Sequence, residues 1–234
     1  MKWVYLTPLL TGLLWPMTSD ATEVYVVEAK GVDLTQGQAL DGSKPLNLAV
    51  GQRVTLITND GRTIKLKGPS SEPPAPDQEG ANPDVVNSLK GLLKSREANT
   101  SSAGAIRQGT ISFEQPDPWV VEIMHNGDRC LRSGEQIVFW RDSVETPSGT
   151  IEISPIDKSW SAHAIWPGKS DRLALPTSLS LQDGQVYTIS LSEGSSTIKI
   201  HVIPSNIRSQ PAQAAWMLEV GCDPQAKSLI GKLD

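Results

Sequence analysis

Short runs of alternating apolar and polar residues dominate the first part of the chain. Four runs rich in β-branched side chains are separated by turn signals such as Asp41-Gly42 and Asn59-Asp60-Gly61. The runs cover residues 24–27, 46–48, 54–57 and 63–66. In the third run Val54 and Leu56 share one face, as a half-buried antiparallel strand requires. The pattern predicts a small all-β module over residues 22–68.

A proline-rich linker and an amphipathic helix are predicted next, over residues 69–108. The segment 68–83 contains five prolines and few apolar side chains, which is typical of an extended linker. Asn82 and Pro83 suit the N-cap and the first position of a helix. The apolar stripe of this helix is formed by Val85, Val86, Leu89, Leu92 and Leu93. We expect a helix that packs one face on the protein, and a helix that docks a partner is the alternative.

The rest of the chain, residues 109–234, returns to short strands. Strand runs are expected near Ile111 and Phe113, at 119–123, at 137–140 and at 151–153. The clearest hairpin pairs Val186–Leu191 with Thr197–Val202, and Asn126-Gly127 is a further hairpin signal. Strands of this length and spacing predict a β-sandwich of immunoglobulin-like architecture.

The chain ends with two helix-prone segments. Gln210–Val220 is rich in alanine and is predicted to end at Gly221, and Asp223-Pro224 is predicted to begin a second short helix. The predicted fold is therefore mainly β, with a small β-roll module, a linker helix, and a sandwich that carries a C-terminal helical hairpin.

The N-terminus predicts export. Lys2, an apolar stretch over residues 3–15, and the small residues of Ser19-Asp20-Ala21 match a cleavable signal peptide covering residues 1–21. A buried N-terminal helix or strand is the alternative. Export implies a periplasmic or secreted protein, and no later stretch has the ~20 apolar residues of a membrane span, so no stable insertion is expected after cleavage.

Cys130 and Cys222 are the only two cysteines. In an oxidising compartment an even pair indicates a disulfide, which would attach the helical hairpin to the sandwich. Two separate buried thiols are the alternative.

The turns and apolar positions of the first module have a recognisable arrangement. It consists of Gly31, Gly37, the run Pro45–Val54 and the hairpin run Asp60–Leu66. Over residues 24–67 this arrangement resembles the FecR-type periplasmic domain. Regulators of that family carry a membrane helix before the domain, which we do not find here, so the resemblance implies an extracytoplasmic binding or assembly role.

Composition and sequence motifs limit the classes of function that the chain could have. The formal net charge of -5 and pI of about 5.3 provide no basic surface for nucleic acid. His125, His163 and His201 are not spaced as metal ligands, and no cofactor motif occurs, so neither a metal nor a cofactor is expected. The Ser-x-x-Lys match at Ser196 and Lys199 lies in a predicted hairpin, where that motif has no catalytic context.

Tryptophan supplies the one candidate contact surface. Trp119, Trp140 and Trp216 lie in apolar periodic segments and are expected in the core. Trp160 and Trp166 flank His163 before a Pro-Gly turn, and partial exposure would let these three residues bind a partner. We therefore expect a non-catalytic binding protein of the bacterial envelope that docks a protein or a glycan. The alternatives are an envelope hydrolase that uses carboxylates on glycan, and a structural scaffold.

Overall fold

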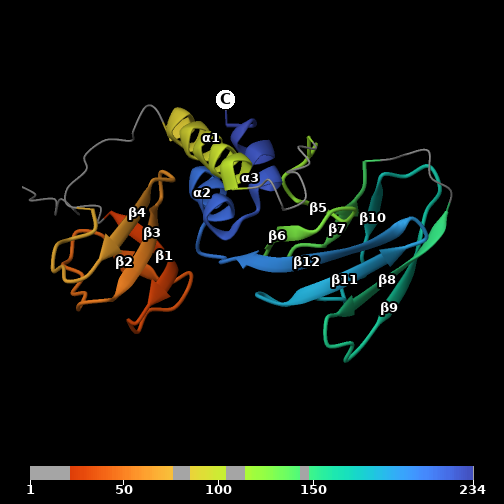
Figure 1. The fold of residues 1–234 in the computed structure, drawn as a ribbon, viewed down its shortest axis with the longest axis horizontal. Coiled ribbons are helices and arrows are strands. Elements are labelled where there is room, and N and C mark those ends of the chain that lie inside the picture. Colours follow the sequence, from red (N-terminus) through yellow and green to blue (C-terminus); the bar gives the residue numbers. More distant parts are fainter. Residues whose placement is uncertain (1–21, 76–84, 104–113, 143–147, 234) are drawn as a thin grey trace, which may run out of the picture.

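The computed structural model describes residues 22–75, 85–103, 114–142 and 148–233. Within these ranges the chain is mainly β, with three sheets and three helices (Figure 1). The predicted signal peptide, the strand near Ile111 and the helix cap at Asn82 and Pro83 lie outside the described residues. No helix in the described residues is both long and apolar enough to cross a bilayer.

The first sheet is antiparallel and has the order β2-β1-β3-β4. Its strands are β1 (Glu23–Lys30), β2 (Ala39–Asp41), β3 (Arg53–Thr58) and β4 (Thr63–Lys67). Val24, Val26 and Leu56 pack into the core of this module, while Tyr25 and Ile57 pack against the helices. The sheet is therefore buried on both faces, which explains why β1 carries four consecutive buried residues.

The strand predicted at residues 46–48 is wrong. Leu48 forms only an isolated bridge with Ser70, and the ladder position beside β1 is taken by β2. The Leu48 side chain is nevertheless buried in the module core. The apolar pattern of residues 46–48 therefore indicates burial and not a strand, and the backbone of Leu48 pairs with the segment that follows β4.

That segment, residues 69–75, lies against the first sheet. Ala75 donates its backbone N–H to Gly42 and is buried in the same core. The segment 69–75, predicted as part of the linker, thus packs as part of the first module.

The remaining strands form a two-layer sandwich. One sheet has the order β10-β7-β5 and the other the order β6-β12-β11-β8-β9. The strands are β5 (Val120–Glu122), β6 (Gly127–Arg132), β7 (Val138–Trp140), β8 (Gly149–Pro155), β9 (Ala162–Trp166), β10 (Arg172–Ala174), β11 (Val186–Leu191) and β12 (Gly194–Ile203). Apolar residues from both sheets, among them Val121, Phe139, Ile153 and Ile198, form one core. The predicted sandwich is confirmed.

The predicted hairpin of β11 and β12 is confirmed, with Leu191 opposite Gly194. The hairpin predicted at Asn126-Gly127 is wrong, because the strands on either side join different sheets. β5 pairs in parallel with β7, and β6 pairs in parallel with β12. Pairings between strands so distant along the chain leave no local turn signal.

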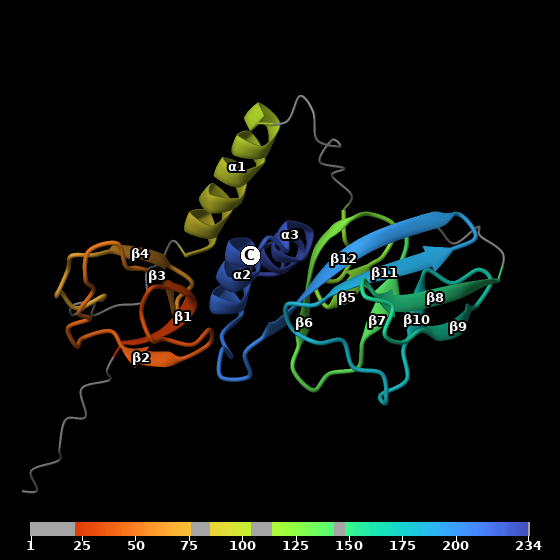
Figure 2. The same ribbon diagram turned by 60° about the horizontal axis from the view of Figure 1, so that its bottom comes forward.

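The three helices are α1 (Val85–Ala103), α2 (Gln210–Val220) and α3 (Asp223–Ile230). They pack on one another, and α2 and α3 form a helical layer between the first sheet and the sandwich (Figure 2). The bounds of α2 and the start of α3 agree with the prediction, because Ser209 caps α2 through its side chain and prolines occupy the first turns. Leu89 and Leu93 of the predicted stripe in α1 are buried in the helical core.

The disulfide between Cys130 and Cys222 is present and both residues are fully buried. It joins β6 to the turn between α2 and α3. Gln225 of α3 supports the same junction, because its side chain accepts from the Cys130 N–H at 2.6 Å and donates to the Cys130 carbonyl at 2.8 Å. The open side of β6 is therefore covered by a helix.

The first module is fixed to the segment that precedes and begins α2. The side chain of Asn206 donates to the Gly37 carbonyl at 2.8 Å. Gly61 has a φ of +85°, and a Cβ there would lie 2.7 Å from the carbonyl oxygen of Pro211. Only glycine permits this approach of the β3–β4 turn to α2.

Candidate functional site

The predicted contact residues Trp160, His163 and Trp166 all lie in the β8–β9 hairpin, but they do not form one surface. Trp160 is 36% exposed and rests on Tyr187, with ring centroids 5.9 Å apart. His163 is exposed on β9. Trp166 has no exposed surface, and its indole N–H donates to the Ser170 carbonyl at 2.7 Å.

Partial exposure is confirmed for Trp160 and is wrong for Trp166. Side chains alternate along a strand, so His163 and Ile165 face solvent while Trp166 faces the sandwich core. The guanidinium of Arg141 lies 4.7 Å from the centroid of the Trp166 ring and covers it further. Trp166 is therefore a packing residue. Trp140 and Trp216 are buried as expected, and Trp119 is half-buried.

Exposed apolar side chains concentrate in the same hairpin. Four large apolar residues of the described chain are exposed: Val50 at 82%, Ile156 at 65%, Trp160 at 36% and Ile165 at 73%. Three of the four lie between the end of β8 and the end of β9. Val50 lies apart from them, in the first module.

β9 is also the last strand of its sheet, and the described residues form no backbone hydrogen bond to its outer edge. Natural proteins protect such edges with charged residues or proline. β9 has the sequence Ala-His-Ala-Ile-Trp, with neither. Asp41 in β2, Lys65 in β4 and Arg172 in β10 place charges on three other edges, whereas Glu122 in β5 and Arg129 in β6 are buried in an ion pair with each other.

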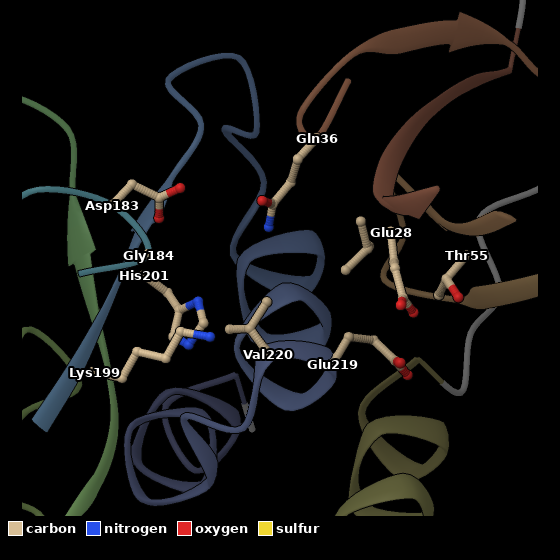
Figure 3. A pocket seen from close by; sticks show the side chains of 10 residues that line it. Glu28, Gln36, Thr55, Asp183, Gly184, Lys199, His201, Glu219 and Val220 are labelled. Carbon is tan, nitrogen blue, oxygen red and sulfur yellow. The ribbon is translucent and has the colours of Figure 1, made fainter. Parts of the chain in front are cut away.

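A cleft of about 400 Å³ lies between the first sheet, the sandwich and the end of α2 (Figure 3). Glu28 and Thr55 line it from β1 and β3, Lys199 and His201 line it from β12, and Glu219 lines it from α2. The lining is mostly polar and includes no Phe, Tyr or Trp side chain. Sequence reasoning missed this cleft, because its walls come from three distant parts of the chain.

His201 faces away from the sandwich core and into the cleft. Its side chain is only 12% exposed, and Nε2 lies 2.7 Å from Oδ1 of Asp128. The parallel pairing of β6 with β12 brings the two residues together. No local signal in the sequence indicates that pairing.

A buried ion pair shapes the turn between β5 and β6. The Glu122 carboxylate accepts from Arg129 Nη2 at 2.6 Å and lies 3.0 Å from Nδ1 of His125. Burial lowers the pKa of Arg129, and the nearby Glu122 carboxylate opposes that shift. Arg129 also donates to three backbone carbonyls of this turn. Each of the three guanidinium nitrogens makes at least one hydrogen bond, so the pair holds the turn together.

The residues considered for nucleophilic chemistry are otherwise engaged. Ser196 is 3% exposed and donates its hydroxyl to the Ile123 carbonyl at 2.5 Å. Lys199 lies three residues along β12, on the opposite face of the strand. Both cysteines form the disulfide. Across the described ranges, no group of three or more His, Cys, Asp or Glu side chains is placed to hold a metal ion.

Comparisons with known proteins return no match, either to a protein-family model or to a curated protein. The FecR-type resemblance of the first module therefore remains a prediction, and the function rests on the geometry.

Proposed function

We propose that this protein is an exported, non-catalytic binding protein of the bacterial envelope that docks a protein partner along β9. The observation that carries the proposal is the β9 edge, which lacks charge and proline and displays Ile165. An extended segment of a partner would pair with the unsatisfied backbone groups of this edge and place alternate side chains against Ile165 and His163.

The other edges support a specific role for β9. Charged side chains disfavour strand addition at the edges formed by β2, β4 and β10, and α3 covers β6 through Gln225. An exposed strand edge without charged residues promotes unspecific aggregation, because other chains can pair with its backbone. A partner strand that covers it in the cell accounts for its composition.

The glycan alternative has less support. Stacking on a sugar needs an exposed aromatic face, but Trp166 is buried beneath Arg141 and no Phe, Tyr or Trp lines the cleft. Of the two tryptophans in this hairpin, only Trp160 reaches solvent. Export is supported by the predicted signal peptide and by the disulfide, which suits an oxidising compartment.

The proposal is tested by capturing envelope proteins on the immobilised full chain and titrating the captured partner against variants. Ile165→Lys places a charge on the edge and should weaken binding at least about tenfold, as loss of a central apolar contact does. Val50→Lys is the matched control, since Val50 is equally apolar and more exposed but lies in the first module. Equal affinity of Ile165→Lys and the unmodified protein would contradict the proposal.

A further inference from the structure

The cleft in Figure 3 has two walls that belong to separate parts of the molecule. The first sheet contributes Glu28, the sandwich contributes Lys199, and Val220 at the end of α2 lies between them. The first module is anchored to α2 and to the segment before it, through contacts such as that of Asn206 with Gly37. The helical layer thus holds the walls apart at a fixed separation.

Glu28 is directed into the cleft by an irregularity of β1. The register of β1 against β3 shifts between Val26 and Glu28, so that Val27 is an extra residue. Such a bulge re-aims the neighbouring side chains, and bulges are frequent beside binding sites. Both Val27 and Glu28 line the cleft as a result.

Three other polar groups of the lining are held by contacts within the protein. Glu219 pairs with Lys65 at 3.1 Å, and His201 lies 2.7 Å from Asp128. Asp183 accepts the Val202 N–H at 2.7 Å and keeps its negative charge.

Glu28 and Lys199 are different. Neither has an ion-pair or hydrogen-bond partner for its side chain in the described residues, and they stand on opposite walls. Across the cleft, the Glu28 carboxylate and the Lys199 ammonium are therefore available to a ligand, and the apolar side chain of Val220 lies between them.

From this arrangement we propose that the cleft binds a short zwitterionic peptide, with its ammonium on Glu28 and its carboxylate on Lys199. A space of about 400 Å³ lies within the usual range for small-ligand sites and accommodates a peptide of two or three residues. Val27 and Val220 would contact its apolar atoms. This site is independent of the docking edge on β9.

The test uses the full chain and three related probes: triglycine, N-acetyl-triglycine and triglycinamide. The second lacks the ammonium, and the third lacks the carboxylate. Binding is measured by calorimetry and by amide chemical shifts of residues that line the cleft. We expect triglycine to bind at one site, and removal of either terminal charge to weaken binding by about tenfold, the usual effect of losing one charge-assisted hydrogen bond.

Substituting Glu28 and Lys199 then shows which residue binds the ammonium of the peptide and which binds its carboxylate. Glu28→Gln should weaken triglycine but leave N-acetyl-triglycine unchanged, and Lys199→Met should weaken triglycine but leave triglycinamide unchanged. Both residues are exposed and unpaired, so the variants should fold normally. Glu152→Gln, which alters an exposed carboxylate on β8, is the matched control and should have no effect.

The proposal is overturned if triglycine shows no saturable binding up to about 10 mM, where a site with two charge-assisted hydrogen bonds would be well populated. It is also overturned if the three probes bind equally, or if Glu28→Gln and Lys199→Met weaken every probe alike. Ile165→Lys should not change triglycine binding, so the test of the cleft is independent of the test of partner docking on β9.

Discussion

Replacing Gln225 by methionine tests how α3 is joined to the sandwich. The Gln225 side chain accepts from the Cys130 N–H and donates to the carbonyls of Cys130 and Pro118, at distances of 2.6, 2.8 and 2.9 Å. Gln225 is fully buried, so no water would replace these bonds. Methionine has a similar volume, which limits the effect of any cavity. The substitution should therefore act mainly through the three backbone groups that lose their partner.

The expected loss follows from those three groups. A buried polar group without a hydrogen-bond partner costs about 1–3 kcal/mol. At about 1–2 kcal/mol for each of the three groups, the free energy of unfolding should fall by about 3–6 kcal/mol. Urea unfolding followed by tryptophan fluorescence measures it, because the tryptophans beyond the predicted signal peptide all lie in the sandwich and α2. The control is Gln185→Met, at an exposed glutamine, and should cost little. A loss below about 1 kcal/mol for Gln225→Met would refute this reasoning.

Three further predictions concern the disulfide, the junction of the first module and pH. Replacing both Cys130 and Cys222 by alanine opens a loop of 92 residues and should lower the free energy of unfolding by about 4–5 kcal/mol in urea titrations. Gly61→Ala and Gly51→Ala both place alanine at a φ of +85°, but only a Cβ at position 61 would meet backbone atoms. In thermal unfolding, Gly61→Ala should therefore lose about 1–3 kcal/mol more stability than Gly51→Ala. Equal losses for the two variants would contradict the packing of the β3–β4 turn on α2. Burial, and then donation of the phenol to a carboxylate, raise the pKa of Tyr25 from 10.0 to about 12. The folded state favours the neutral phenol, so the stability it provides is complete below pH 10.0 and is lost as the pH rises through about 12; a Tyr25→Phe variant should lack this dependence in pH-dependent unfolding.

Local signals in the sequence predicted the parts of the fold that depend on neighbours along the chain. The end of α2 follows from Gly221, and the β11–β12 hairpin follows from two adjacent runs with a tight turn. The disulfide follows from an even pair of cysteines. Each of these features needs only short-range information.

Features built from distant segments could not be predicted in this way. The parallel ladder of β6 with β12 places His201 beside Asp128, and nothing near either residue indicates it. The same holds for Glu28 and Lys199, which meet at the cleft only because the helical layer sets the two parts side by side. For Trp166, the alternation along β9 was visible in the sequence, but the side of the strand that faces the core was not.

The docking role of β9 is tested most directly by a photo-activated cross-linking side chain at position 165, expressed in the source cells and irradiated there. Position 50, with its equally apolar and highly exposed Val50, is the control. The proposed role predicts that a single protein partner is cross-linked at position 165 and not at position 50. No cross-linked partner at position 165, or the same set of products at both positions, would contradict it.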